Sequence, residues 1–558
     1  MVLKNRSRYL RIAFLLCNTI GIILFHNFLY SQPLSQEKPD RKKSQVWIAD
    51  QKDGTYINPI IFADYSDPDV LRINDDFFLV ASSFNCTPVL PILHSKDLVN
   101  WKIVGHVSEN LPHSAFNSPQ HGKGCWAPSI RFHKGEVFVY YGDPDYGIYM
   151  SKTKNPFGSW EPLTLVKEAK GWIDPCPFWD DDGQAYLVHA WAKSRVGFNS
   201  VLHMNRMSAD GRQIFGDSVL VFDGHTFHPT IEGPKMYKRN EYYYIFAPAG
   251  GVASGWQTVL RSKNIFGPYE DKIVLARGSS QVNGPHQGGW IETQSKESWF
   301  VHFQEHGAYG RIVHLQPMVW KDSWPIIGID SDGNGIGEPV LRCIKPNVGK
   351  TFPLCFPQTD DEFNTTTLGF QWQWHANHSK EWYSLKEKTS VLRLISNPLK
   401  QDDVNLWSCP NLLLQKIPAP QCIITSKLEF FPSTQGDKVG LIVMGIDYSY
   451  VALTKKENGP HIIKASCSDA DKSTPENIES DIPYSGNSIY LRISIDSGAV
   501  CSYSFSNDGL SYRSVGKKFS AREGRWIGAK VGLFVLSPQE TKIKGYADFD
   551  WFRIERQE

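Results

Sequence analysis

A five-fold internal repeat is the feature that most constrains how this chain can fold. Each copy has a lead-in containing proline, a short alternating strand, a polar turn, and a second strand rich in aromatic and β-branched residues. The copies recur every 45 to 65 residues without long helical periodicity, which leaves room for about four strands in each unit. They read "SDPDVLRINDDFFLVASS" from Ser66, "WAPSIRFHKGEVFVYYG" from Trp126, "IDPCPFWDDDGQAYLVHA" from Ile173, "IEGPKMYKRNEYYYIFAP" from Ile231 and "PHQGGWIETQSKESWFVHF" from Pro285.

This repeat predicts an all-β chain in which residues 55–347 form a five-bladed β-propeller. An all-β sandwich with insertions is the alternative. The first strand of each blade in a propeller lines the central axis, so the lead-ins are expected to converge at one mouth of the channel. The converging residues are Asp67, Ala127, Asp174, Glu232 with Gly233, and His286.

A conspicuous run of acidic residues, Asp180 to Asp182, follows the third lead-in. An EF-hand loop alternates acidic residues with spacers before its glycine, whereas these three aspartates are consecutive. Asp-Gly after an apolar run is typical of a hairpin turn. We expect this run to turn a hairpin at the end of the strand that points away from the mouth.

Three carboxylates from three different blades can do glycosidic chemistry. Cleavage of a glycosidic bond needs one protonated acid for the leaving oxygen and one ionised carboxylate that acts as nucleophile or activates water. A third carboxylate raises the pKa of a neighbour by like-charge repulsion. A structural role for all three is a poor explanation, because buried carboxylates without cationic partners are costly.

The same segments resemble the sequential signatures of glycoside hydrolase family 43, in family order, across about 290 residues. The segments are "NPIIFADYSDPDV", "CWAPSI", "GWIDPCPFWDDDG", "TIEGPKMYK", "NGPHQGGWI" and "YGRIVHLQPMVW". The resemblance implies a five-bladed propeller that hydrolyses α-L-arabinofuranosides or β-D-xylosides with inversion. It also implies that Asp67 is the general base, Glu232 the general acid, and Asp174 the carboxylate that raises the pKa of Glu232 and orients it.

Further site residues follow from the resemblance alone. It places Phe84, Trp126, Ala127, Ile173, Arg311 and His286 at the substrate. It also makes His286 a candidate ligand for a structural Ca²⁺ in the channel, although a histidine after proline is more often structural. The chemistry itself requires no cofactor. Inversion predicts that the carboxyl groups of Asp67 and Glu232 lie about 6.5 to 9.5 Å apart, with room for a water molecule.

The rest of the chain divides into four segments. Residues 1–31 have a basic start and an apolar run and are expected to be an export signal, with an uncleaved membrane anchor as the alternative. A polar lead follows at 32–54. Residues 348–361 are expected to be a linker, and the turn-separated apolar runs of 362–558 predict a β-sandwich of jelly-roll type. We expect this second domain to buttress the propeller rather than to bind carbohydrate.

Composition narrows the possible partners. The formal net charge of +1 provides no basic field for nucleic acid. The 18 Trp and 23 Tyr suit either β-rich cores or stacking on sugar rings. Nine cysteines follow the signal, an odd number without a CxxC motif, so several are expected to be buried free thiols.

Taken together, these features predict an exported, exo-acting, inverting enzyme that removes terminal α-L-arabinofuranose from plant cell-wall polysaccharide or oligosaccharides. A β-D-xylosidase, or an enzyme with both activities, is the alternative, and a non-catalytic carbohydrate-binding propeller is a more distant one. The expected location is periplasmic, cell-surface or extracellular, without stable membrane insertion once the signal is cleaved.

Overall fold

The computed structural model describes residues 45–399 and 403–557 of the 558-residue chain. The expected signal at 1–31 and the first part of the expected lead lie outside the described residues. Among the described residues, no helix is long and apolar enough to cross a membrane. Their only α-helix is the single turn α1 (Lys193–Val196), so this part of the chain is almost entirely β-structure.

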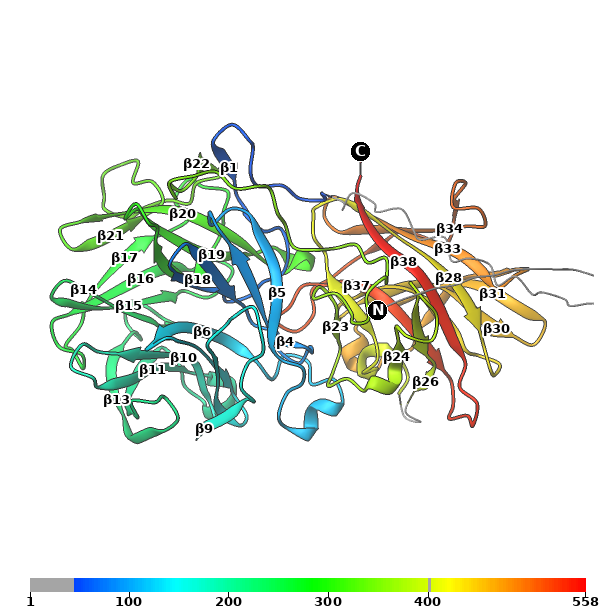
Figure 1. Cartoon of the computed structure of the whole chain (residues 1–558), viewed down its shortest axis with the longest axis horizontal. Coiled ribbons are helices and arrows are strands. Elements are labelled where there is room, and N and C mark those ends of the chain that lie inside the picture. The colour runs from blue at the N-terminus through cyan, green and yellow to red at the C-terminus, as the bar shows by residue number, and fades with distance from the viewer. Residues whose placement is uncertain (1–44, 400–402, 558) are drawn as a thin grey trace, which may run out of the picture. The chain divides into compact units, whose positions relative to one another are not determined.

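Five four-stranded antiparallel sheets follow one another along the chain, each with its strands in sequence order. They form the predicted five-bladed propeller, whose strands run from blue to green in Figure 1. The strands of blades one to three are β2 (Asp69–Ile73), β3 (Asp76–Val80), β4 (Val89–Ser95), β5 (Trp101–Ser108), β6 (Trp126–His133), β7 (Glu136–Asp143), β8 (Gly147–Thr153), β9 (Thr164–Glu168), β10 (Trp172–Trp179), β11 (Ala185–Trp191), β12 (Val201–Met207) and β13 (Ile214–Asp223). Those of blades four and five are β14 (Lys235–Arg239), β15 (Tyr242–Ala249), β16 (Trp256–Ser262), β17 (Glu270–Leu275), β18 (His286–Glu292), β19 (Ser298–Glu305), β20 (Arg311–Lys321) and β21 (Trp324–Ile327).

The hydrophobic cores of the propeller lie between neighbouring blades. Phe78 and Val80 of blade one, for example, share a fully buried cluster with Ile130 and Val139 of blade two. Similar clusters join each further pair of neighbours, including blade five with blade one. Each strand pair therefore buries both faces, which explains why the second strands of the repeat are so rich in aromatic and β-branched residues.

The ring is closed by the segment that precedes the first blade. Ile61 exchanges backbone hydrogen bonds with Val313 of β20, at 3.0 and 3.3 Å. The Asn58 amide adds bonds to the backbone of Leu315 in both directions. Nearby, β1 (Thr55–Ile57) pairs with β22 (Arg342–Ile344), the strand that leaves the last blade. The two ends of the propeller are thus held together by main-chain bonds.

Residues 360–399 and 403–557 form a sandwich of two eight-stranded sheets, as predicted. One sheet holds β23 (Gln373–Trp374), β26 (Asn397–Pro398), β27 (Leu413–Lys416), β29 (Lys438–Met444), β30 (Tyr448–Lys456), β31 (Gly459–Cys467), β32 (Asn477–Pro483) and β37 (Lys530–Ser537). The other holds β24 (Tyr383–Ser384), β25 (Leu392–Ile395), β28 (Cys422–Phe431), β33 (Ser488–Asp496), β34 (Val500–Ser506), β35 (Arg513–Ser514), β36 (Phe519–Ser520) and β38 (Tyr546–Arg556). Alternating apolar residues of both sheets form the core between them.

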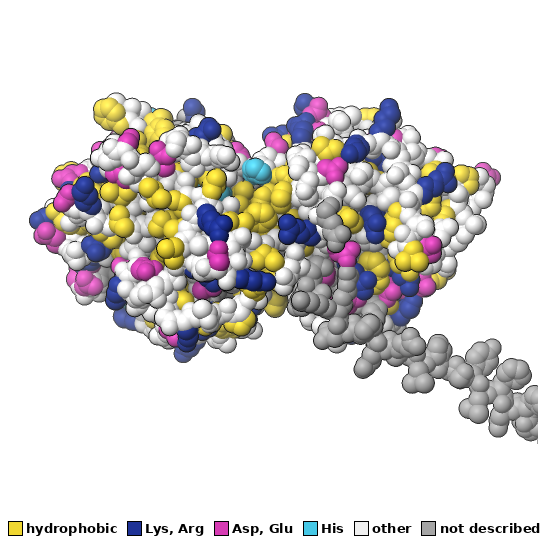
Figure 2. Space-filling model, turned by 90° about the horizontal axis from the view of Figure 1, so that it is seen from above, with side chains coloured by type: hydrophobic (Ala, Val, Ile, Leu, Met, Phe, Trp, Pro, Cys, Tyr) yellow, Lys and Arg dark blue, Asp and Glu magenta, His cyan; other side chains and the backbone are white. Residues whose placement is uncertain are grey.

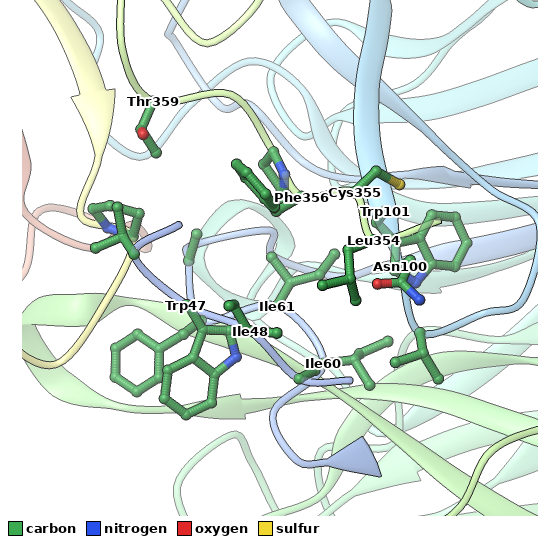
Figure 3. Close-up of a pocket in the computed structure, with 17 residues that line it drawn as sticks. Trp47, Ile48, Ile60, Ile61, Asn100, Trp101, Leu354, Cys355, Phe356 and Thr359 are labelled. Carbon is green, nitrogen blue, oxygen red and sulfur yellow. The ribbon is translucent and has the colours of Figure 1, made fainter. Parts of the chain in front are cut away.

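The described part of the lead and the linker pack together beside the first blade. Figure 3 shows Trp47, Ile61, Leu354 and Phe356 around a small cavity of about 40 Å³. The Trp47 indole donates to the Pro59 carbonyl at 2.9 Å, which fixes the lead at this place. The walls of this cavity contain no carboxylate or histidine, and their one ionisable side chain is the thiol of Cys355.

Charged side chains are dispersed over the surface. Figure 2 shows basic and acidic groups interspersed on the face that it draws, without a large region of one sign. This distribution agrees with the near-zero net charge and gives no electrostatic footprint for a polyanion on that face.

Candidate active site

The five lead-ins share one backbone feature that the sequence does not show. One residue in each has a positive φ: Asp67 (53°), Ala127 (31°), Asp174 (57°), Gly233 (58°) and Gln287 (38°). Three of these positions are also register shifts at the start of the inner strand. A left-handed conformation is uncommon for residues with a Cβ atom and is often retained at functional sites. The five-fold geometry therefore points to the mouth of the channel as the site.

This register corrects the predicted alignment by one residue. Gly233 and Gln287 are the equivalents of Asp67 and Asp174, whereas Glu232 and His286 each lie one position earlier. Gly233 has a second constraint besides its φ, because a Cβ atom there would lie 2.8 Å from the side chain of Gln287. The third acid thus reaches the site from a different backbone position than the other two.

A cavity of about 270 Å³ lies at this mouth. Eight of the nine predicted site residues line it: Asp67, Phe84, Trp126, Ala127, Ile173, Asp174, Glu232 and Arg311. The ninth, His286, is fully buried behind Glu232. The lining residues that the sequence did not single out are Trp191, Ala192, Lys193, Ser194, Asn199, Val252, Gln287 and Trp526.

Asp67 is held by a donor on each carboxylate oxygen. Arg311 Nη1 donates to Oδ1 at 2.9 Å, and the Ser82 hydroxyl donates to Oδ2 at 2.6 Å. The Ser82 oxygen in turn accepts the Ala127 N–H at 2.8 Å, so its own proton is directed at Asp67. Both oxygens act as acceptors, which is the bonding pattern of an ionised carboxylate. The predicted sugar-binding Arg311 therefore also fixes the predicted base.

Asp174, unlike Asp67, is surrounded by groups that disfavour its ionised form. It is 4% exposed, and its Oδ2 accepts the Gly233 N–H at 2.7 Å. Burial, followed by the negative charges of Glu232 and Asp67, raises the pKa of Asp174 to about 8. The negative charge of Glu232 therefore adds to burial in disfavouring the ionised form of Asp174.

Glu232 faces the cavity, and its side chain is 30% exposed. Its Oε1 lies 3.0 Å from His286 Nε2, an imidazole that is itself completely buried. A histidine with its proton on Nε2 donates to this oxygen and leaves the other carboxyl oxygen free. The three carboxyl groups therefore occupy three distinct environments: one ionised, one buried and one open to the cavity.

The sandwich domain contributes a wall of the cavity, which sequence reasoning missed. Trp526 lies in the loop before β37, has a φ of 65° and is 51% exposed. Its indole makes an edge contact with Trp126 at 6.3 Å between ring centroids, and the Arg311 guanidinium lies 5.7 Å from the ring. The second domain thus does more than buttress the propeller. Exposed aromatic faces at a cavity of this kind suit stacking on a sugar ring.

A second cavity, of about 440 Å³, shares Arg311 and Trp526 with the first. Glu305 of blade five and Glu523 and Arg525 of the sandwich supply its charged groups. Arg311 and Trp526 thus join the two cavities, and none of the three carboxyl groups lines the second one.

The channel does not fit the expected Ca²⁺. Calcium takes six to eight oxygen ligands. His286 uses Nε2 for Glu232, and the ammonium of Lys235 and the guanidinium of Arg131 are buried among the inner strands. Among the residues that the structure describes, no three His, Cys, Asp or Glu side chains form a metal-binding group. The positive charges of Lys235 and Arg131 would repel a Ca²⁺ ion in the channel.

Two family models match the chain. Residues 56–325 match the model of glycosyl hydrolases family 43, and residues 360–555 match that of the β-xylosidase C-terminal concanavalin A-like domain. The matches coincide with the propeller and the sandwich.

Curated relatives match over almost the whole chain. A protein of Xylanibacter ruminicola, named provisionally as a β-xylosidase, is 38% identical over 93% of this chain and 94% of its own. A β-xylosidase of Formosa agariphila is 31% identical over 90% of each chain. A non-reducing end α-L-arabinofuranosidase of Bacteroides ovatus is 27% identical over 91% of this chain and 96% of its own.

Solved structures show the same fold. A xylan β-1,4-xylosidase from Bacillus halodurans aligns with a TM-score of 0.78 at 24% identity, over 90% of this chain and 100% of that chain. The three acids at the propeller mouth, both family models and the full-length relatives agree, and the chain belongs to glycosyl hydrolase family 43.

Proposed function

We propose that this glycoside hydrolase is an exo-acting, inverting β-D-xylosidase. The observation that carries the choice of sugar is the pair of relatives above 30% identity, both named as β-xylosidases, one of them provisionally. The sequence favoured α-L-arabinofuranose as the released sugar, with β-D-xylose as the alternative. The proposed function now takes this alternative. Exo action is supported by the size of the cavity at the three acids, which is about 270 Å³, has Trp526 as one wall and suits one terminal sugar.

In the proposed mechanism, Asp67 activates water and Glu232 protonates the leaving oxygen. Asp67 suits the base because Arg311 and Ser82 donate to both of its oxygens and hold the ionised form in one orientation. Glu232 suits the acid because it faces the cavity, where a leaving oxygen can reach it. The two act from different blades, on opposite sides of the bound sugar.

Asp174 is proposed to keep the acid protonated. Burial and the nearby charge of Glu232 both disfavour the ionised form of Asp174. When Glu232 gives its proton to the substrate, the resulting charge lies beside Asp174 and is relieved once the product leaves and a proton returns. The expected separation of Asp67 and Glu232, about 6.5 to 9.5 Å, belongs to this inverting mechanism and remains a prediction.

An α-L-arabinofuranosidase activity is the second candidate, supported by the Bacteroides ovatus relative at 27% identity. Both sugars present similar hydroxyls, and the same three acids serve either. Export and a plant cell-wall substrate are also part of the proposal, on the basis of the basic and apolar start of the chain and the pentoside-type relatives.

The test compares 4-nitrophenyl β-D-xyloside with 4-nitrophenyl α-L-arabinofuranoside for the purified full-length protein. We expect higher kcat/KM for the xyloside, and proton NMR of the first product should show the α-anomer of xylose. Glu232→Gln should lose activity by about 10² to 10⁴ on a substrate that needs acid assistance. Higher kcat/KM for the arabinofuranoside would reverse the choice of sugar, and a β-anomer product would contradict inversion.

A further inference from the structure

The channel beneath the catalytic cavity is filled by polar side chains that join successive blades. Asp69 of blade one binds the Arg131 guanidinium of blade two at 2.6 Å, and Arg131 also donates to Cys176 Sγ of blade three at 3.0 Å. The Tyr237 hydroxyl of blade four accepts the Trp290 N–H of blade five at 3.0 Å. These contacts form a plug that runs around the axis, directly after the five left-handed positions.

Lys235 also belongs to this plug and lies three residues after Glu232. It is completely buried, and its Nζ donates to the Pro128 carbonyl and to Ser129 Oγ, both at 3.0 Å. Lys235 and Ser129 stand two residues after the left-handed positions of blades four and two, so the side chain crosses the channel. The ammonium therefore lies near the axis, below the mouth.

The buried charge of Lys235 is not neutralised by its direct partners. Both are uncharged oxygens, and among the described residues no carboxylate lies within ion-pairing distance of this ammonium. An ammonium buried with only neutral partners is costly unless negative charge lies nearby. The nearby negative charge is that of the catalytic acids, since Lys235 acts on Asp174 and lowers its pKa against the larger effect of burial.

The other cations around the channel are already paired. Arg131 is bound to Asp69 at 2.6 Å, and Arg311 is bound to Asp67 at 2.9 Å. Asp174 and Glu232 are left with the neutral donors Gly233 and His286 and with the unpaired Lys235. The positive charge of Lys235 is therefore the one that balances the negative charge of Asp174 and Glu232.

We propose that the Lys235 ammonium is the resident cation of the channel, standing where a metal ion would otherwise be needed, and acts as a positioning residue for the Asp174–Glu232 pair. It places a fixed positive charge, held by Ser129 and the Pro128 carbonyl, beneath two acids whose combined negative charge increases when Glu232 gives up its proton. The enzyme then needs no divalent ion. The effect on catalysis depends on the roles proposed above for these two acids.

The experiment uses the full-length protein and three variants: Lys235→Met, which removes the charge at similar volume, Lys235→Arg, which keeps it, and Ser129→Ala, which removes only one brace. The pH dependence of kcat/KM is measured with whichever 4-nitrophenyl pentoside the wild type hydrolyses. Metal content and the thermal midpoint of the wild type, with EDTA and with added Ca²⁺, are measured without substrate.

Removing the positive charge favours the protonated forms of the two acids. Lys235→Met should therefore shift both limbs of the pH profile upward by about one unit or more, whereas Lys235→Arg and Ser129→Ala should stay close to the wild type. The wild type should contain no stoichiometric metal, and its midpoint should not respond to EDTA or Ca²⁺.

A folded Lys235→Met variant with the wild-type pH profile would overturn the proposal, as would bound Ca²⁺ or a midpoint lowered by EDTA. If Lys235→Met fails to fold, a shifted profile in the folded Lys235→Arg variant would also count against it. If neither pentoside is hydrolysed, the proposed function fails, but metal content and midpoint still decide whether the channel relies on a metal.

Discussion

Replacing Asp174 by asparagine is expected to stabilise the protein above neutral pH while it removes activity. Burial, followed by the negative charges of Glu232 and Asp67, raises the pKa of Asp174 from 3.8 to about 8. Its favourable contribution is fully present below pH 3.8 and is lost as pH rises toward 8, because the folded state then resists ionisation. Asparagine keeps the acceptor for the Gly233 N–H but cannot ionise.

The magnitude follows from the difference between these two pKa values. At about 1.4 kcal/mol per pH unit it sets an upper bound of about 6 kcal/mol. An imperfectly bonded amide costs about 1 to 3 kcal/mol, so we expect a net stabilisation of at most about 3 to 5 kcal/mol at pH 8 to 9. Near pH 4, where Asp174 is protonated in the folded state and about half protonated in the unfolded state, the cost of the amide dominates, and the variant should be less stable by about 1 to 3 kcal/mol. The kcat of the variant should fall by about 10² to 10⁴.

The assay is urea unfolding at intervals from pH 4 to pH 9, followed by circular dichroism, together with turnover of the 4-nitrophenyl pentoside. Asp180→Asn is the matched control at the other end of β10. Asp180 is bound by Lys238 and Tyr243, which lower its pKa against the effect of burial, so this variant should be destabilised at neutral pH and unaffected at low pH. Parallel pH profiles for Asp174→Asn and the wild type would refute the reasoning.

Three further predictions concern the walls and the backbone of the site. Asp67→Asn should lower kcat/KM by at least about 10², measured with the same pentoside, because the amide cannot take a proton from water; near-wild-type turnover would remove Asp67 from the mechanism. Trp526→Ala should raise KM about ten-fold in steady-state assays with a smaller change in kcat, since an aromatic contact contributes about 1 to 1.5 kcal/mol; an unchanged KM would mean that the indole does not touch substrate. Gly233→Ala should lower the free energy of unfolding by about 1 to 3 kcal/mol, because it adds a Cβ atom at φ 58° against Gln287, and an unchanged thermal midpoint would contradict this.

Much of the fold was readable because a propeller repeats one short-range pattern. Proline-containing lead-ins, alternating strands and a polar turn recur in each blade, and this register brought Asp67 and Asp174 together across more than 100 residues. The same logic correctly separated Asp174 from the run at Asp180, which turns the β10–β11 hairpin through an Asp180–Gly183 backbone bond. Patterns of this kind depend on local propensity and are visible in a sequence.

The remaining features depend on backbone conformation or on long-range contacts. The left-handed φ at Gly233 cannot be read from the sequence. Glu232 was therefore aligned with Asp67 and Asp174 by residue type, and this alignment was wrong by one position. Trp526 reaches the cavity across some 400 residues from Trp126, and nothing near it in sequence signals that contact. Lys235 was not singled out in the sequence, because its burial and its bonds to Pro128 and Ser129 come from the structure.

The position of Trp526 places substrate recognition and catalysis on different parts of the chain. The three acids are fixed by strained, interlocked lead-ins of the propeller, where most substitutions cost stability. One wall of their cavity comes from a loop in another domain, which is not part of the lead-ins that hold the three acids. Substitutions in this loop can therefore change which glycosides are accepted while the bond-breaking machinery stays intact, so that substrate range can drift in evolution, or be redesigned in the laboratory, independently of catalysis.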